Sequence, residues 1–138
     1  MSRINKFDWN EYLDYAKDTF TQVSNPGSSL PPLNDEAKLR ATISRAYYAV
    51  FNLARSFANS DGTSYFNNNA ISIHEEVIQH FNTKGNQTRR QISTNLQRLK
   101  QERIKADYKT PRIDYSTADL SIRLAEQIQA GLEQLEDP

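Results

Sequence analysis

The longest hydrophobic pattern in the chain lies between residues 39 and 58, LRATISRAYYAVFNLARSFA. Apolar residues recur there at alternating spacings of four and three, which places them on one face of an α-helix of about five turns. These residues are Leu39, Ile43, Ala46, Val50, Leu53 and Phe57, and the stripe is widened by Tyr47, Phe51, Ala54 and Ala58. Asn34 or Asp35 is the predicted N-cap of this central helix, and the turn signal at Ser60 is its predicted end.

The opposite face of the central helix is polar and rich in arginine. It carries Arg40, Ser44, Arg45, Tyr48, Asn52 and Arg55. Guanidinium and hydroxyl groups displayed along a rigid helix form a surface suited to an anion. An equally compatible interpretation is structural, in which Tyr47 and Tyr48 fill volume and the arginines are solvated.

A first helix is predicted to begin at Asp8, a favourable N-cap residue, and to end near Val23. Its apolar face is formed by Trp9, Tyr12, Leu13, Ala16 and Phe20. The Pro/Gly/Ser-rich residues 24–33 follow as a connection, because neither flanking helix could bury its apolar stripe alone.

Two capping boxes predict two further helix starts. Ser72 with Glu75 opens a short helix over residues 73–81, and Ser116 with Asp119 opens the last helix. The apolar face of the last helix is formed by Ala118, Ile122, Ala125, Ile128, Leu132 and Leu135.

A fourth helix is predicted over residues 87–108 and is stopped by Thr110 and Pro111. Its seam consists of Ile92, Leu96, Leu99, Arg103 and Ala106. Arg103 therefore stands where the spacing calls for an apolar residue, and burying its guanidinium without a partner would be costly. Asp107, one turn further on, and the tyrosines of the central helix are the predicted partners. The alternative is a surface ion pair at the rim of the core.

These patterns add up to an all-α fold, an antiparallel up-and-down bundle of four long helices plus one short helix. No strand pattern or repeat competes with this interpretation. A chain of 138 residues suits one domain with its own core, so we expect a single helical-bundle domain over residues 1–138.

The composition argues against several kinds of site. Without cysteine the chain has neither a disulfide nor a thiolate metal site. Residues 74–78, HEEVI, do not match the HExxH zinc motif, and His74 and His80 fall on different faces of their helix. His74 is interpreted as a helix-start residue with a hydrogen-bonded ring. No glycine-rich phosphate loop is present either, so neither a metal nor a cofactor is predicted.

No segment predicts attachment to a membrane. The apolar run over residues 46–51 is too short to span a bilayer, and the N-terminal sequence MSRINKFDWNEY lacks an apolar signal core. We therefore expect a soluble, cytoplasmic protein.

The net charge of zero hides a segregation of charge along the chain. Residues 84–112 hold nine Lys or Arg against two acids, a net of +7, whereas residues 113–138 hold six acids against one Arg, a net of −5. The basic segment indicates either a face that binds nucleic acid or phosphate, or an ordinary solvated helix surface.

Three segments together resemble the signature segments of the HEPN family, small helical-bundle proteins of prokaryotes. They are SRAYYAVFNLAR over residues 44–55, His74 at the start of the following helix, and RIKADY over residues 103–108. The match runs in order over roughly residues 8–135. The resemblance implies an all-α bundle, often a homodimer, in which the central and fourth helices build a site for RNA or nucleotide.

The resemblance also implies a biological setting. Members of the family are often paired with a nucleotidyltransferase protein. Many are metal-independent ribonucleases that act as toxins in toxin–antitoxin or abortive-infection systems.

The chain departs from the ribonuclease motif of that family, which is Arg followed, after four to six residues, by His on the fourth helix. No His follows Arg103 here, and Asp107 and Tyr108 stand where the His is expected. Imidazole has the unperturbed pKa that suits proton transfer near neutrality, whereas Tyr and Asp need strong perturbation for that work. The sequence therefore leaves open whether the protein is an enzyme.

Three functions remain compatible with the sequence. The first is a HEPN-like module that binds RNA or nucleotide, or docks a nucleotidyltransferase, through Arg45, Tyr48, Arg103 and Asp107. The second is an endoribonuclease in which Arg103 stabilises phosphate and Asp107 or Tyr108 replaces the missing His. The third is a structural dimerisation bundle.

The charge pattern also yields an expectation about which arginines matter. Binding of RNA or nucleotide should depend on Arg103 and Arg45 more than on the exposed basic residues. Arg103 lies on the seam, where water is scarcer, and its fork can engage phosphate bidentately. The basic residues expected to be exposed, namely Arg89, Arg90 and Lys100, should add only a salt-dependent background.

Overall fold

The computed structural model describes residues 7–61, 70–109 and 111–136, and every regular element within these ranges is an α-helix. The helices are α1 (Trp9–Thr21), α2 (Leu33–Ser60), α3 (Ala70–His80), α4 (Gln87–Tyr108) and α5 (Tyr115–Glu136). The prediction of an all-α fold is confirmed. The helices span 13, 28, 11, 22 and 22 residues in chain order, so α1 is closer in length to α3 than to the other three.

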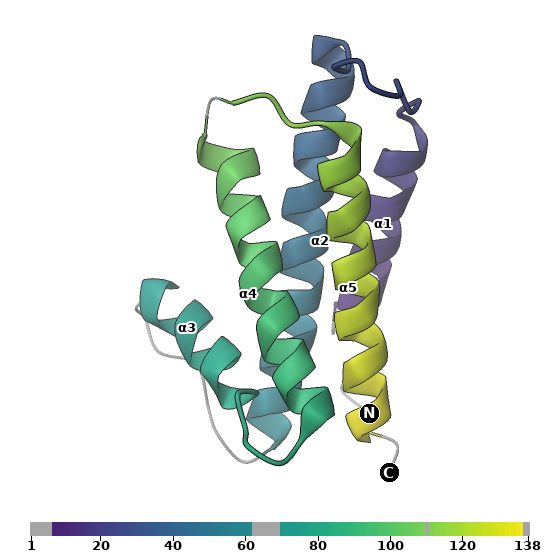
Figure 1. The fold of residues 1–138 in the computed structure, drawn as a ribbon. Helices are drawn as coiled ribbons and strands as arrows, with labels where there is room; N and C mark the ends of the chain where they lie inside the picture. The colour runs from purple at the N-terminus through teal and green to yellow at the C-terminus, as the bar shows by residue number, and fades with distance from the viewer. Residues whose placement is uncertain (1–6, 62–69, 110, 137–138) are drawn as a thin grey trace.

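The longest helix, α2, is the centre of the bundle (Figure 1). In that view α1 and α4 run upward while α2 and α5 run downward. Among the described residues, α2 packs against each of the other four helices, whereas α1 and α4 do not pack on each other. The short helix α3 lies beside α4 and the lower half of α2. One face of α2 is therefore shared with α4, and another is shared with α1.

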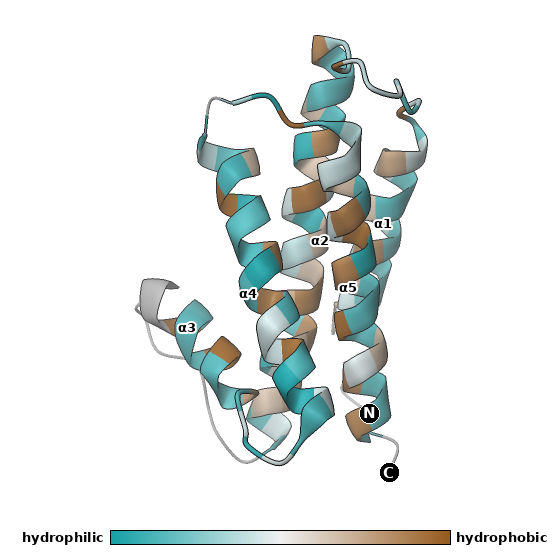
Figure 2. Ribbon diagram, viewed as in Figure 1, coloured by the Kyte–Doolittle hydropathy of each residue, from teal (hydrophilic) through white to brown (hydrophobic). Residues whose placement is uncertain are grey.

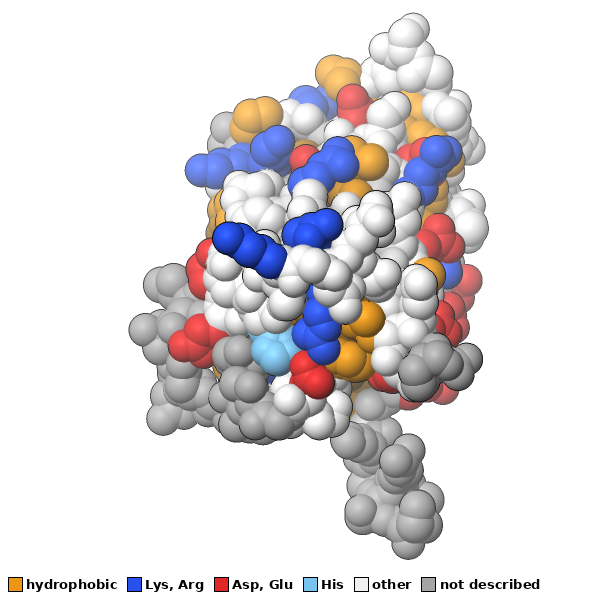
Figure 3. Space-filling model, turned by 60° about the horizontal axis from the view of Figure 1, so that its bottom comes forward, with side chains coloured by type: hydrophobic (Ala, Val, Ile, Leu, Met, Phe, Trp, Pro, Cys, Tyr) orange, Lys and Arg blue, Asp and Glu red, His pale blue; other side chains and the backbone are white. Residues whose placement is uncertain are grey.

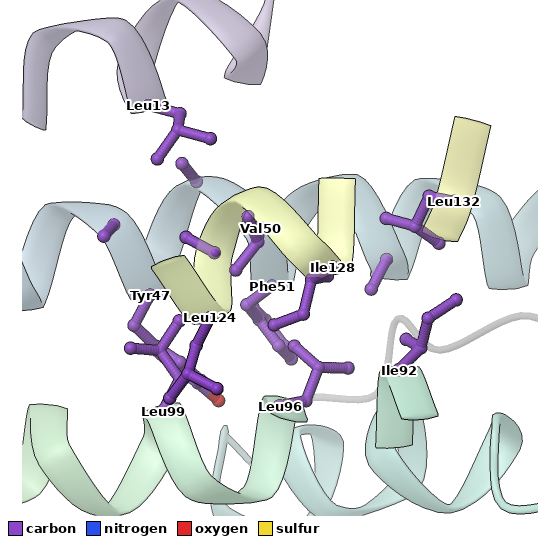
Figure 4. Close-up of a cluster of buried hydrophobic side chains, with 14 of the residues drawn as sticks. Leu13, Tyr47, Val50, Phe51, Ile92, Leu96, Leu99, Leu124, Ile128 and Leu132 are labelled. Atoms are coloured by element: carbon purple, nitrogen blue, oxygen red, sulfur yellow. The ribbon is translucent and has the colours of Figure 1, made fainter. Parts of the chain in front are cut away.

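The core forms where the apolar stripes of α2, α4 and α5 meet. Hydrophobic and hydrophilic residues alternate along each helix in Figure 2, as the periodicity predicts. Figure 4 shows Phe51 of α2, Leu96 of α4 and Ile128 of α5 with their side chains directed toward one another. All three side chains are buried, which removes their apolar surface from water and supplies the main driving force for folding.

A second apolar cluster lies toward the end of the bundle where α2 begins and α4 ends. It consists of Val23, Leu39, Ile43, Ala106, Ile113 and Ala118. This cluster joins the connections that follow α1 and α4 to the body of the bundle.

Helix boundaries agree with the sequence patterns most closely for α1 and α4. The Asp8 carboxylate accepts a hydrogen bond from the backbone N–H of Asn10 at 2.9 Å and caps α1 as predicted. The bounds of α4 are the predicted ones, and the Asn86 side chain caps its first turn through the N–H of Arg89 at 3.0 Å. Thr110, one of the two predicted stop residues, lies outside the described residues.

The start of α2 differs from the prediction. The helix begins at Leu33, so Asn34 and Asp35 lie inside its first turn rather than at its cap. Pro32 is the N-cap, and its carbonyl accepts the first helical hydrogen bond, from the N–H of Glu36 at 2.9 Å. The φ of Pro32 is −56°, close to the value that the proline ring fixes, and no side chain caps this helix start. The end at Ser60 is as predicted.

Both predicted capping boxes are wrong. Helix α3 begins at Ala70, so Ser72 lies within it. Helix α5 begins at Tyr115, so Ser116 is likewise inside the helix. The Asp114 carboxylate takes the capping role, because it accepts hydrogen bonds from the N–H of Thr117 at 2.9 Å and from its hydroxyl at 2.7 Å. These bonds lower the pKa of Asp114.

Within the described residues, no helix is long and apolar enough to cross a membrane.

Candidate functional site

Arg103 occupies the buried seam of α4, as the spacing predicts. Only 7% of the residue is exposed, and its neighbours along the seam, Leu99 and Ala106, are buried as well. The alternative that places Arg103 at the rim of the core is therefore wrong, whereas the ion pair with Asp107 that it named is present. The register of α4 against α2 brings the guanidinium to the pair of tyrosines on α2, as expected.

Three tyrosine rings surround the Arg103 guanidinium. Its central carbon lies 5.3 Å from the ring centroids of Tyr47 and Tyr48 and 5.8 Å from that of Tyr108. A cation this close to aromatic faces is attracted by the ring quadrupoles. We call Arg103, Tyr47, Tyr48, Asp107 and Tyr108 the Arg103 site.

The hydrogen bonds of Arg103 are incomplete. Its carboxylate partner is Asp107, one turn along α4, at 3.7 Å between Nη1 and Oδ2. That oxygen also accepts a hydrogen bond from the hydroxyl of Ser44 on α2, at 3.4 Å. The buried Nε of Arg103 has no hydrogen-bond partner among the described residues. A buried donor without an acceptor is uncommon in folded proteins, so this guanidinium retains capacity for a further acceptor.

His74 of α3 joins the site through Tyr47. The Tyr47 hydroxyl and His74 Nδ1 lie 2.7 Å apart, and the imidazole stacks on the Phe51 ring at 4.2 Å between centroids. Burial, followed by the positive charges of Arg103 and other nearby cations, lowers the pKa of His74 to about 4. Burial also raises the pKa of Tyr47 well above its ordinary value. At neutral pH both side chains are therefore neutral.

This protonation state decides what the site can do chemically. A general acid or base works best when its pKa lies near the working pH. The pKa values of His74 and Tyr47 are displaced in opposite directions from neutrality, so neither side chain exchanges a proton easily there. The arrangement favours holding an anion by charge and hydrogen bonds over moving a proton.

Tyr48, Asp107 and Tyr108 form the side of the site that solvent reaches. Tyr48 is partly buried, Asp107 is exposed, and Tyr108 is 71% exposed at the end of α4. The structure thus brings together Tyr48, Arg103 and Asp107, three of the predicted binding residues, and Tyr108, which the sequence predicts as a catalytic candidate.

Arg45, the fourth predicted binding residue, points to a different helix. Its Nη1 donates to the Thr19 hydroxyl at 3.3 Å, and its guanidinium lies 4.5 Å from the Tyr15 ring centroid, both on α1. Successive helical residues are about 100° apart, so Ser44 faces α4 while Arg45 faces α1. The structure does not bring Arg45 into contact with Arg103, and a role for Arg45 in binding stays a prediction.

The basic residues of α4 are less uniform than the sequence predicts. Arg90 is exposed, but Arg89 is paired with Asp61 at 2.8 Å, and Lys100 is paired with Glu75 at 2.8 Å. The expectation that Arg89 and Lys100 are free surface charges is therefore wrong. Figure 3 shows Lys and Arg side chains mostly across the upper half of the view, with acidic side chains along its right-hand edge and also on its left.

The two histidines belong to different clusters, as their spacing predicts. His74 contacts Tyr47, whereas His80 lies 3.0 Å from the Asp61 carboxylate near the opposite end of α3. Hydrogen bonds from Arg89 and His80 lower the pKa of Asp61. In the part of the chain that the structure describes, no group of three or more His, Cys, Asp or Glu side chains could hold a metal ion.

Sequence reasoning missed the partnership of Tyr47 with His74. The ring of His74 is hydrogen-bonded, as expected, but its place beside the Arg103 site was not predicted. One signal was available, because a tyrosine on a buried stripe needs a partner for its hydroxyl. The partner itself is 27 residues away, on another helix, so spacing could not identify it.

Comparison with protein-family models, with curated proteins and with solved structures found no match to this chain.

Proposed function

We propose that this protein is a HEPN-like module that binds RNA or a nucleotide, holding a phosphate group at Arg103. The observation that carries the proposal is the incomplete coordination of this guanidinium, with its only carboxylate at 3.7 Å and its Nε without a partner among the described residues. A planar guanidinium engages phosphate through two parallel hydrogen bonds, which suits a phosphate better than a point charge would.

The electrostatic surroundings support an anionic ligand. Besides burial, the charges of three cations, Arg103, Lys100 and Arg55, lower the pKa of His74, whereas the charge of Glu75 raises it. Because His74 is neutral, it adds no charge of its own at neutral pH. The exposed ring of Tyr108 lies beside the guanidinium and offers a face on which a base can stack.

The alternative is an endoribonuclease that uses Asp107 or Tyr108 in place of the missing His. The displaced pKa values of His74 and Tyr47 make these two side chains poor replacements for that His, so cleavage would have to depend on Asp107 or Tyr108. The resemblance further suggests a nucleotidyltransferase as protein partner, within a toxin–antitoxin or defence system.

A homodimer is part of the same proposal. We expect two copies to associate through a face that includes α2 or α4, which would place two arginine-bearing surfaces in one cleft. Sedimentation velocity at micromolar concentration measures this, and a single monomeric species would contradict it. A dimer that binds neither RNA nor nucleotide would support the structural alternative.

Titration of a fluorescently labelled single-stranded RNA of mixed sequence tests the proposal, with ATP as a competitor. Arg103→Gln should weaken binding, and Arg98→Gln is the matched control, because Arg98 is an exposed arginine on the same helix. Circular dichroism confirms that both variants fold. If the two variants lost affinity equally, binding would be explained by a diffuse basic surface rather than by the Arg103 site.

The same RNA, labelled at its 5′ end and incubated with EDTA present, separates binding from cleavage. If the protein binds this RNA and leaves it intact, the result supports a binding module. Metal-independent cleavage that Arg103→Gln abolishes would favour the ribonuclease.

A further inference from the structure

A second arginine, Arg40 of α2, holds the last turn of α4. The carbonyls at the end of a helix run short of helical partners, and Arg40 Nη1 donates to that of Ala106 at 2.8 Å. It also donates, at 3.3 Å, to the carbonyl of Lys105, which accepts the backbone N–H of Lys109 as well, at 3.1 Å. The same guanidinium also donates to the carbonyls of Lys109 at 3.1 Å and Pro111 at 2.8 Å. A cation at this position also opposes the negative end of the α4 dipole.

Glu36 holds Arg40 in that position. Its carboxylate is buried and accepts from Arg40 Nη2 at 2.9 Å and Nε at 3.1 Å. The backbone N–H of Ile113 donates to the same carboxylate at 3.2 Å, and Arg112 hydrogen-bonds its other oxygen. We call Glu36, Arg40 and Arg112 the latch. Burial alone would raise the pKa of Glu36, but these hydrogen bonds lower it, so the latch is charged at neutral pH.

The latch and the Arg103 site share one face of α2 at a regular spacing. Glu36, Arg40, Ser44 and Tyr48 follow one another at four-residue intervals, which places them along one side of the helix. Glu36 and Arg40 hold the carbonyl end of α4. One turn further along α2, Ser44 reaches Asp107, and the next turn places Tyr48 against Arg103.

We propose that Glu36 and Arg40 are positioning residues of the Arg103 site, fixing the last turn of α4 so that Asp107 and Tyr108 stay beside the guanidinium. This inference rests on the proposed function, because it concerns binding at the same site. Asp107 and Tyr108 lie in the last turn of α4, where Arg40 of the latch donates hydrogen bonds to backbone carbonyls. Without the latch that turn frays, and a ligand must order it on binding.

Two variants remove the latch in different ways. Glu36→Gln keeps the shape of the side chain but removes its charge, and Arg40→Lys keeps the charge but cannot reach several carbonyls at once. Each should weaken binding of the labelled RNA about tenfold, because ordering even one extra residue costs that much. Amide hydrogen exchange in the last turn of α4 should become faster in both.

Two control variants separate positioning from general loss of stability. Asp119→Asn breaks an i,i+4 ion pair with Arg123 on α5, at 3.0 Å, of the same type as the Glu36–Arg40 pair. Ile128→Ala destabilises the main core without touching the end of α4. At a temperature where all variants remain folded, both controls should retain RNA affinity within about twofold and leave exchange in the last turn of α4 unchanged relative to the rest of the helix.

The outcomes distinguish this inference from the proposed function. Weaker binding together with faster exchange in both latch variants, but in neither control, supports positioning. RNA binding at full affinity in Glu36→Gln, or unchanged exchange, would overturn positioning while leaving the binding site standing. If the wild-type protein bound neither RNA nor ATP, the proposed function would fail and the positioning role would fail with it.

Discussion

Arg40 and Arg103 are both arginines between α2 and α4, each with a carboxylate four residues away on its own helix, yet their surroundings are opposite. Arg40 lies 2.9 Å from the Glu36 carboxylate and donates to four backbone carbonyls. Arg103 lies 3.7 Å from Asp107, and its buried Nε has no acceptor among the described residues. Aromatic rings surround Arg103 where carbonyls surround Arg40.

This difference separates a structural arginine from one that is available to a ligand. A guanidinium whose donors are satisfied has little to gain from a phosphate, since a new bond would only replace an existing one. A guanidinium held by cation–π contact and one long ion pair can still gain strong hydrogen bonds. Burial does not explain this difference, because the Arg40 side chain, at 24% exposed, is less buried than that of Arg103, at 9%. The number of satisfied donors is therefore the informative quantity.

The largest predicted effect is on stability at the latch. Glu36→Ala removes the carboxylate that accepts hydrogen bonds from Arg40, Arg112 and the N–H of Ile113. Removing one member of a buried charged network should lower the free energy of unfolding by about 3–5 kcal/mol, measured by urea denaturation. Arg103→Leu is the contrasting variant and should change it by less than about 1.5 kcal/mol, because little satisfied hydrogen bonding is lost. If both variants lost the same free energy of unfolding, the distinction between a structural Arg40 and an available Arg103 would be wrong.

The next largest effect is on RNA binding, for which a change at Arg103 should matter more than a change at the latch. Arg103→Gln should weaken RNA affinity by roughly 1.5–3 kcal/mol at every salt concentration, the range for hydrogen bonds to a charged group. Arg98→Gln should instead lower the slope of log affinity against log salt by about one, if it touches a phosphate. Fluorescence anisotropy from low to physiological salt measures both. A change of slope alone in Arg103→Gln would count against a directed contact.

Periodicity was sufficient to predict the surroundings of Arg103 but not those of Arg40. The seam of α4 identified Arg103 as a polar residue at a core position, and its i+4 neighbour Asp107 was visible in the same helix. Arg40 looked like one more arginine on a polar face. Besides Glu36, its partners are backbone carbonyls 65 to 71 residues away, and carbonyls carry no sequence signal.

Direction around a helix explains why Arg45 did not join the site. The sequence pattern predicts one continuous polar face on α2, but the structure divides it between two neighbouring helices. Ser44 reaches Asp107 on α4, while the adjacent Arg45 reaches Thr19 on α1. Which helix packs on which side depends on the topology of the bundle. The sequence pattern of a single helix does not predict that topology.

His74, beside the Arg103 site, and Glu36, in the latch, should affect stability in different ranges of pH. The pKa of His74 falls from its ordinary 6.5 to about 4 on folding, so the unfolded chain binds more protons between these values. Stability should therefore decline as pH falls from 6.5 to 4, by about 1–2 kcal/mol for a partly buried ring, and His74→Gln should flatten this slope. The pKa of Glu36 is lowered, so the latch contribution is present above its ordinary carboxylate value and is lost only as pH falls through the lowered one.

Urea denaturation at intervals of pH provides the measurement. If the decline between pH 6.5 and 4 persisted unchanged in His74→Gln, another group would be responsible for it. Asp114 and Asp61, whose pKa values are also lowered, would contribute only at more acidic pH.

The smallest predicted effect comes from Tyr47→Phe, which removes a single hydroxyl. That hydroxyl lies 2.7 Å from His74 Nδ1, and its loss should cost about 0.5–1.5 kcal/mol of stability, measured by the same urea denaturation. The aromatic ring remains, so the cation–π contact with Arg103 and the RNA affinity should be unchanged within about twofold. If binding persisted but metal-independent RNA cleavage disappeared, the hydroxyl would take part in chemistry. The Tyr47–His74 pair would then be catalytic despite its displaced pKa values, and the ribonuclease alternative would prevail.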